Sequence, residues 1–150
     1  MNYSIVKLPS MKFVGITGSH LNFSKIWTLF YENMHRIKHM NETDMLYGIE
    51  LFPQDYHVNG IYTYMACTEV IQIDETPSKM EAFEIPEAFY LQVSTSLEDV
   101  LAGKHLKKCY SLTKEIGLTI AAPYNLKQFK HGFKVTKGNT VDICIPVLNS

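Results

Sequence analysis

Apolar and polar positions alternate along much of this chain, and two segments follow nearly the same plan. Leu8 to Ser19 reads LPSMKFVGITGS, and Glu84 to Leu97 reads EIPEAFYLQVSTSL. Each has an aliphatic residue before a proline, then an aromatic position, an aliphatic alternation and a hydroxyl-bearing end. Alternation at every second residue is typical of a strand with one buried face. The chain therefore resembles one unit written twice, with repeats at about residues 1–75 and 80–150.

Helical spacing follows the first strand of each unit. In residues 22–40, apolar side chains recur at steps of three and four, which predicts a helix with one buried face. A second helix is predicted to begin near Leu97, because Thr95-x-x-Glu98 and Ser96-x-x-Asp99 both resemble capping boxes, and to end at Gly117. Each unit thus contributes one main helix.

The remaining alternating segments predict strands, and Asn59-Gly60 and residues 137–139 predict tight turns before the last strand of each unit. The strands expected besides the two segments above are residues 47–52, 61–73, 126–135 and 141–147. Neither unit can bury its apolar face alone, so the two sheets should join. We expect one α+β domain over residues 1–150: a duplicated strand-helix-strand-strand repeat, an antiparallel sheet, two main helices on one side and a ligand cleft between the halves.

Composition and charge exclude several classes of protein. The length of 150 residues suits one domain, and a net charge of −1 without a basic patch argues against direct nucleic-acid binding. We expect no membrane association, because no apolar run approaches about 20 residues and the start lacks the features of a signal peptide. Three cysteines without a C-x-x-C pair favour a reducing cytoplasm.

Metal and cofactor sites are not predicted. His35 and His39 are four residues apart, the spacing of metal-binding helices, but no acidic residue completes an H-E-x-x-H pattern. Basic neighbours favour a solvated helix face instead. The same two histidines are poorly placed as axial ligands of haem. We therefore expect neither a metal nor an organic cofactor.

Aromatic side chains are the candidate ligand contacts, because flat rings bind aromatic or cationic molecules by area and by π-face attraction. Tyr62 and Tyr64 are two apart on a strand and point to the same face. They could line a cavity or pack as core, and for Trp27 the core interpretation is favoured. The full set is Trp27, Tyr47, Tyr62, Tyr64, Phe89, Tyr90 and Phe129.

Two carboxylates lie within otherwise apolar strands. Glu50 and Glu69 could point outward to water, or they could lie in the cleft. We favour the cleft for Glu50 because of its place in the repeat, and the solvated position for Glu69. If the protein is an enzyme, Glu50 is the candidate general base, since burial among aromatic rings can raise the pKa of a carboxyl group.

Short motifs spread over nearly the whole chain resemble the GyrI-like small-molecule-binding domain, which is also the effector-binding domain of AraC-type and BmrR-type regulators. The motifs are Leu8-Pro9 with Val14-Gly15, Ile26-Trp27 with Phe30, Tyr47-Gly48-Ile49, Tyr62 and Tyr64, Ile85-Pro86 with Tyr90, Gly117, and Ile143-Cys144-Ile145-Pro146-Val147. The resemblance implies a duplicated fold with an aromatic pocket between its halves. Members bind hydrophobic, often cationic, molecules; some inhibit gyrase and some hydrolyse toxins.

The chain departs from this family at one charged position. Many members carry an acid in a Phe-Glu-x-Tyr pattern after the second helix, and here Lys127 stands in its place, in the run Leu126-Lys127-Gln128-Phe129. The repeat mate is taken as Glu50. If both line the seam they could approach each other; because an unpaired buried charge is costly, they would need either to pair or to reach solvent. A ligand with an anionic or zwitterionic part then becomes plausible.

Three functions remain open at this stage. The first is a stand-alone binding protein for a hydrophobic or amphipathic small molecule, with Trp27, Tyr47, Glu50, Tyr62, Tyr64, Tyr90, Lys127 and Phe129 as its site. The second is a hydrolase of strained or electrophilic toxins. The third is an inhibitor with a protein partner, either gyrase or a separately encoded regulator. We rank them in this order.

Overall fold

Eight strands form a single antiparallel sheet in the computed structural model, which describes residues 2–41, 45–133 and 139–148. The first half contains β1 (Tyr3–Leu8), β2 (Met11–Ser19), η1 (His20–Asn22), α1 (Phe23–Asn33), η2 (Met34–Arg36), β3 (Leu46–Leu51), α2 (Tyr56–Asn59) and β4 (Thr63–Val70). The second contains β5 (Glu81–Ile85), β6 (Ala88–Ser96), α3 (Leu97–Leu101), α4 (His105–Ile116), β7 (Tyr124–Phe133) and β8 (Thr140–Val147). The predicted α+β class and duplicated element order are confirmed.

The order of the strands has an internal two-fold symmetry. Along the sheet it is β1-β6-β8-β7-β3-β4-β2-β5. Exchanging each strand with its counterpart in the other half reverses this order and leaves it otherwise unchanged. The symmetry axis therefore passes between β3 and β7, the pair through which the two halves join.

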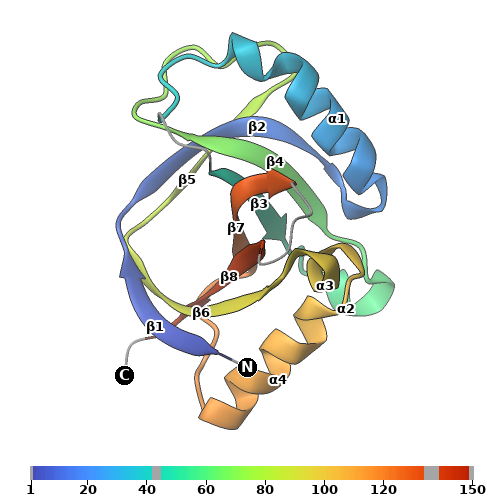
Figure 1. Ribbon diagram of the computed structural model, residues 1–150, viewed down its shortest axis with the longest axis vertical. Helices are drawn as coiled ribbons and strands as arrows, with labels where there is room; N and C mark the ends of the chain where they lie inside the picture. Colours follow the sequence, from blue (N-terminus) through green and yellow to red (C-terminus); the bar gives the residue numbers. More distant parts are fainter. Residues whose placement is uncertain (1, 42–44, 134–138, 149–150) are drawn as a thin grey trace.

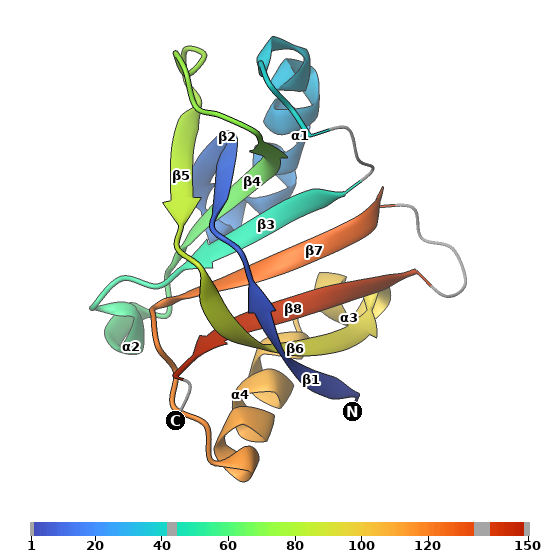
Figure 2. The same cartoon turned by 90° about the vertical axis from the view of Figure 1, so that its left-hand side faces the viewer.

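The first strand of each half belongs to the sheet of the other half. β1 pairs with β6, and β5 pairs with β2, so Tyr3–Ser19 and Glu81–Ser96 are two long bent segments that run from one half to the other (Figure 2). The bends lie at Pro9 and Pro86, which cannot donate a backbone hydrogen bond to a ladder. The matching Leu-Pro and Ile-Pro motifs thus mark the two places where the chain crosses between halves.

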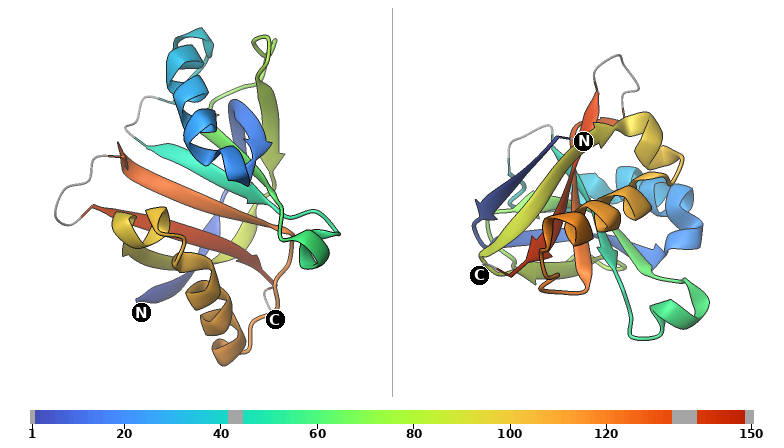
Figure 3. Two further views of the ribbon diagram at one scale, coloured as in Figure 1. Left: turned by 90° about the vertical axis from the view of Figure 1, so that its right-hand side faces the viewer. Right: turned by 90° about the horizontal axis from the view of Figure 1, so that it is seen from below.

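The sheet is strongly curved, and its helices lie on one face (Figures 1 and 3). α1 packs on β2 and β4, whereas α3 and α4 pack on β6, so each helix covers its own half. One cluster of buried side chains, including Trp27, Phe30 and Ile143, fills the space between helices and sheet. A second cluster, including Phe13 and Ile49, fills the opposite, enclosed face.

Several local predictions differ from the structure. The flanking strands β3 and β4 pair antiparallel as a hairpin requires, but the tight turn expected at Asn59-Gly60 is wrong: residues 56–59 form the short helix α2, and Gly60 ends it with a left-handed φ of 69°. The predicted second helix is two helices, because Gly103 adopts a φ of 73° between them. The predicted first helix ends seven residues early as α-helix, at Asn33. The turn predicted at residues 137–139 falls largely outside the described residues.

Within those described residues, no helix combines the length and the apolar composition needed to cross a membrane.

Candidate functional site

The candidate site lies where β3 and β7 pair, on the face of the sheet that carries the helices. Their antiparallel register places Gly48 opposite Lys127 and Glu50 opposite Asn125. Because alternate residues of a strand share a face, these four positions face the same side. Three buried polar side chains, those of Glu50, Asn125 and Lys127, therefore lie together at the seam between the halves.

Glu50 and Lys127 form a buried ion pair at this seam. Lys127 Nζ lies 2.9 Å from Oε2 of Glu50, and their side chains are 4% and 0% exposed. The prediction that the two charges approach each other is confirmed. Tyr62 donates from its hydroxyl to the same oxygen at 3.1 Å, and Asn125 donates to Oε1 at 3.4 Å. Both oxygens of the carboxylate are thus engaged.

These contacts decide the protonation state of Glu50. Burial alone would raise its pKa, but the charge of Lys127 and the neighbouring His105 outweigh that effect and lower the pKa to about 2. The carboxyl group is therefore ionised at neutral pH. The reverse holds for Tyr62, whose pKa is raised by burial and by the adjacent carboxylate, so its phenol stays protonated and acts as a donor.

His105 stands beside this pair without a hydrogen bond of its own. It is the first residue of α4, directly after the break at Gly103, and its side chain is 5% exposed. Nε2 lies 3.7 Å from Oε2 of Glu50, which is too long for a hydrogen bond. Among the described residues, neither ring nitrogen has a hydrogen-bond partner. Unpartnered buried polar atoms are uncommon in proteins and often mark a functional site.

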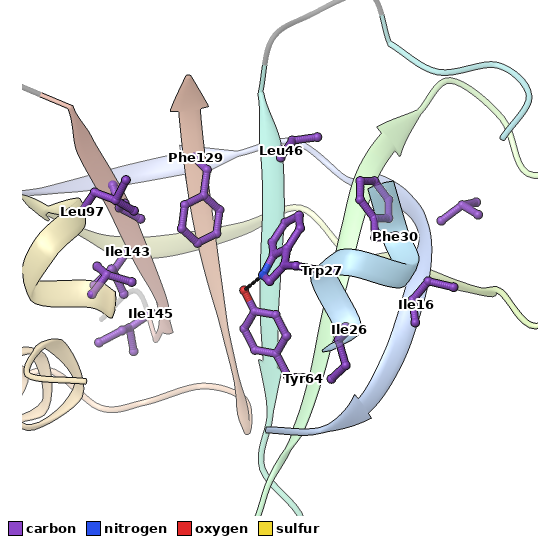
Figure 4. Close-up of a cluster of buried hydrophobic side chains, with 14 of the residues drawn as sticks. Ile16, Ile26, Trp27, Phe30, Leu46, Tyr64, Leu97, Phe129, Ile143 and Ile145 are labelled. Atoms are coloured by element: carbon purple, nitrogen blue, oxygen red, sulfur yellow. Dashed lines mark hydrogen bonds between the residues drawn. The ribbon is translucent and has the colours of Figure 1, made fainter. Parts of the chain in front are cut away.

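Tyr64 fits beside the seam because Gly48 has no side chain. A Cβ at position 48 would overlap the Tyr64 hydroxyl. That hydroxyl accepts a hydrogen bond from Trp27 Nε1 at 3.1 Å, and the Trp27 ring packs edge-on against Phe129 (Figure 4). Lys127 Nζ lies 5.8 Å from the centre of the Tyr64 ring. A packed set of rings therefore fixes the position of the ammonium group.

Two cavities flank the buried pair. The smaller, of about 140 Å³, is lined by His20, Phe23, Tyr62, Tyr64, Val100, Leu101, Gly103, His105 and Lys127. The larger, of about 720 Å³, is lined by Phe52, Pro53, Gln54, Tyr56, His57, Gly103, Leu106, Lys107, Tyr110, Ile120, Ala122 and Pro123. Gly103 lines both, and each cavity takes residues from both halves of the chain. The larger one has the size of a typical small-molecule site.

Comparison with protein families shows which family the chain belongs to. The family model described as the GyrI-like small molecule binding domain matches residues 1–148. The chain belongs to this family. Among proteins of curated function, a sequence comparison finds no match for this GyrI-like chain.

Solved structures share the fold of this GyrI-like domain at low sequence identity. SAV2435 bound to tetraphenylphosphonium is 15% identical, with a TM-score of 0.73, over 99% of this chain and 95% of that one. An integron cassette protein from the mobile metagenome of Vibrio cholerae is 17% identical, with a TM-score of 0.69, over 97% and 95%. The EcmrR C-terminal domain is 11% identical, with a TM-score of 0.73, over 99% and 98%.

Six of the eight predicted site residues lie on the helix-covered face of this GyrI-like fold. Tyr62, Tyr64 and Lys127 line the smaller cavity, and Glu50 lies beneath it, bonded to two of them. Trp27 and Phe129 are buried in the helix-side core and hold Tyr64 in place.

The other two predicted residues lie on the opposite face, so the expectation that they line the cleft is wrong. Tyr47 packs edge-on against Phe13, and the Tyr90 hydroxyl lies 2.7 Å from that of Tyr124. Both belong to the second buried cluster. Alternation along β3 explains the error. Gly48 and Glu50 are two residues apart and share one face of the sheet, whereas Tyr47, one residue before Gly48, points to the other face. Glu69 also lies on this face, beside Tyr47.

The proposed repeat relationship between Glu50 and Lys127 is two residues out of register. Cys67 and Cys144 are repeat mates at the spacing set by the two proline motifs, and so are Ala66 and Ile143. Gly48 pairs with Ala66 and Lys127 pairs with Ile143. The mate of Lys127 is therefore Gly48, and the two face each other across the symmetry axis.

Sequence reasoning missed the residues that give the cavities most of their wall. At the larger cavity, the Phe52 ring contacts the rings of both Tyr56 and Tyr110. At the smaller one, His20 stacks on Tyr62 at a centroid distance of 4.0 Å. The first three lie in or beside the segments where a turn and a continuous helix were expected. The sequence did contain a signal for His105. It lies four residues before Cys109, so both are on the apolar face of the predicted helix, which is expected to be buried.

The helix histidines stay outside the site. His39 Nε2 lies 2.6 Å from Oδ2 of Asp74, and both side chains are substantially exposed. In the described part of the chain, no three His, Cys, Asp or Glu side chains gather closely enough to hold a metal ion.

Proposed function

We propose that this GyrI-like domain binds an aromatic or amphipathic small molecule at the junction of its halves, with the body of the ligand in the larger cavity. The observation that supports this most is the cavity itself, at about 720 Å³, with Phe52, Tyr56 and Tyr110 in its wall. Rigid rings supply contact area at little loss of conformational entropy. The family membership and the ligand-bound structural neighbour agree with such a role.

The smaller cavity would then receive a polar end of the same ligand. Lys127, Tyr62 and Tyr64 line it, and Glu50, the buried ion-pair partner of Lys127, lies outside the lining. A few polar groups within an apolar site are typical of pockets that fix a ligand's orientation.

The three cysteines are free and buried, which agrees with the cytoplasmic location proposed for the protein.

Binding is better supported than hydrolysis by Glu50. A general base works best when its pKa is near the operating pH. The pKa of Glu50 is about 2, and its oxygens are engaged with Lys127, Tyr62 and Asn125. Such a carboxylate is a weak base. Mass spectrometry of a bound ligand after long incubation should recover it unchanged.

Isothermal titration calorimetry against a panel of aromatic and amphipathic compounds tests the proposal. Tyr56→Ala should weaken binding about tenfold, since one aromatic contact contributes on the order of 1.5 kcal/mol. Tyr3→Ala is the matched control, because Tyr3 lies on edge strand β1 and is 49% exposed. The absence of binding across the panel, or an equal loss in both variants, would contradict the proposal.

A further inference from the structure

Basic side chains surround both cavities. His20, His105 and Lys127 line the smaller one, and His57 and Lys107 line the larger one. Among the described residues that line either cavity, none is Asp or Glu. Asp55 lies in the sequence between two lining residues of the larger cavity, Gln54 and Tyr56, but it does not itself line the cavity, and its carboxylate accepts a hydrogen bond from the Asn59 side chain. A ligand in these cavities therefore meets positive and neutral groups.

The nearest carboxylate is unavailable to a cationic ligand. Glu50 is 0% exposed, and Lys127, Tyr62 and Asn125 already occupy its two oxygens. A cation approaching from the smaller cavity would meet the ammonium of Lys127 before the carboxylate. Since like charges in a desolvated site repel strongly, this arrangement disfavours positively charged ligands.

Two donors that line the smaller cavity, on Lys127 and His105, have capacity for a further acceptor. An ammonium has three N–H groups, and the ion-pair partner of Lys127 among the described residues is Glu50. Among the described residues the ring N–H of His105 has no hydrogen-bond partner, although the side chain is only 5% exposed. Burying such donors without an acceptor is unfavourable. An incoming acceptor group would satisfy both.

We propose that the smaller cavity takes the carboxylate of an aromatic acid, bound by Lys127 and His105, so that the domain selects anionic aromatic ligands. This rests on the proposed function and adds the charge class of the ligand. A cavity of about 140 Å³ accommodates a carboxylate. Gly103 lines both cavities, and a Cβ there would meet no atom within 4 Å, so the two cavities adjoin at a position that carries no side chain. The structural neighbour SAV2435 is bound to tetraphenylphosphonium, and the chain described here should prefer the opposite charge.

Three probes with one aromatic body separate charge from shape: 2-naphthylacetate, 2-naphthylacetamide and (2-naphthylmethyl)trimethylammonium. Calorimetry of the unmodified protein at neutral pH should give a Kd for the carboxylate at least about tenfold lower than for the other two, as a charge-assisted hydrogen bond implies. Equal affinities, or tighter binding of the ammonium probe, would overturn the inference. Failure of all three to bind would instead overturn the proposed function on which it rests.

Variants assign the preference to the smaller cavity. His105→Leu should reduce carboxylate affinity about tenfold and amide affinity by less, because the amide oxygen is an uncharged acceptor, whereas His35→Leu, at an exposed position outside both cavities, should change neither. Lys127→Met combined with Glu50→Gln keeps the site neutral and should bring the three probes to within about threefold of one another.

Thermal unfolding establishes that each variant is folded, and the three-probe comparison on the unmodified chain remains decisive if one is not. A carboxylate preference that persists in both His105→Leu and the double variant would place the anion elsewhere, at Lys107 for example, and would refute the assignment.

Discussion

The buried pair of Glu50 and Lys127 is the residue-scale feature on which the site depends. Each charge alone would be costly in a position that is 0–4% exposed, and the pair is viable because each neutralises the other and Tyr62 and Asn125 complete the carboxylate's hydrogen bonds. Removing one partner leaves the other charged and desolvated. The two single substitutions should therefore be less tolerated than the double one.

Unfolding in urea checks this coupling. Lys127→Met should lower the free energy of unfolding at neutral pH by about 3–5 kcal/mol, whereas Glu50→Gln/Lys127→Met should recover most of the loss. If the effects of Glu50→Gln and Lys127→Met simply add in the double variant, the two residues do not interact in solution.

The pH dependence of stability follows from the lowered pKa of Glu50. In the unfolded chain its pKa is near 4.5, and in the folded protein it is about 2. The unfolded state therefore binds the proton more tightly, so the stabilisation is present above about pH 4.5 and is lost as the pH falls toward about 2. Glu50→Gln should flatten this decline in the urea midpoint. Glu75→Gln, at an exposed position, should leave it unchanged, and identical profiles for all three proteins would contradict the assignment.

At the scale of elements, local signals predicted structure where local interactions decide it. The N-cap predicted at the start of the second helix is present, and the Ser96 side chain accepts from the backbone N–H of Asp99. The break at Gly103 was not predictable from periodicity, because the apolar positions of α3 and α4 continue across it in sequence. α2 was missed because Asn59-Gly60 has the composition of a hairpin turn, and here Gly60 caps a helix.

The cap allows a direct test on this element. Ser96→Ala should lower the free energy of unfolding by about 1 kcal/mol, since the backbone N–H of Asp99 loses its acceptor. Ser24→Ala in the first turn of α1 is the control, because Ser24 is exposed and a good helix former replaces a poor one there. Equal losses measured by urea unfolding in the two variants would mean that the cap does not contribute.

On the scale of the whole molecule, the exchanged strands β1 and β5 hold the two halves together. Ile85 of β5 belongs to the buried cluster on the enclosed face, and Val6 and Leu8 of β1 and Phe83 of β5 pack against that cluster. The sequence predicted two units and a seam, but it could not show which strands cross, nor which aromatic residues share a face. The predicted orientations of Tyr47 and Tyr90 were wrong for that reason, because these orientations depend on strand pairings between residues far apart in the chain.

Separated halves provide the corresponding experiment. The segments 2–75 and 79–148, produced apart, should each lack a native sheet, because each half needs a strand from the other. Mixed together, they should regain the far-ultraviolet circular dichroism of the intact chain and co-elute in size-exclusion chromatography. A half that folds stably by itself would show that the exchange contributes little to stability.

The face-to-face position of Gly48 and Lys127 has a consequence for how such a site can arise. In an assembly of two identical copies of one half, the residue on the axis would meet its own duplicate, and two lysines there would repel while two glycines would leave the centre without a charge. Joining both copies in one polypeptide lets the paired positions diverge. Gly48 has no side chain, which leaves room for Tyr64, and Lys127 supplies the ammonium group. A single chain with both halves can therefore have an asymmetric centre, which two identical copies of one half cannot.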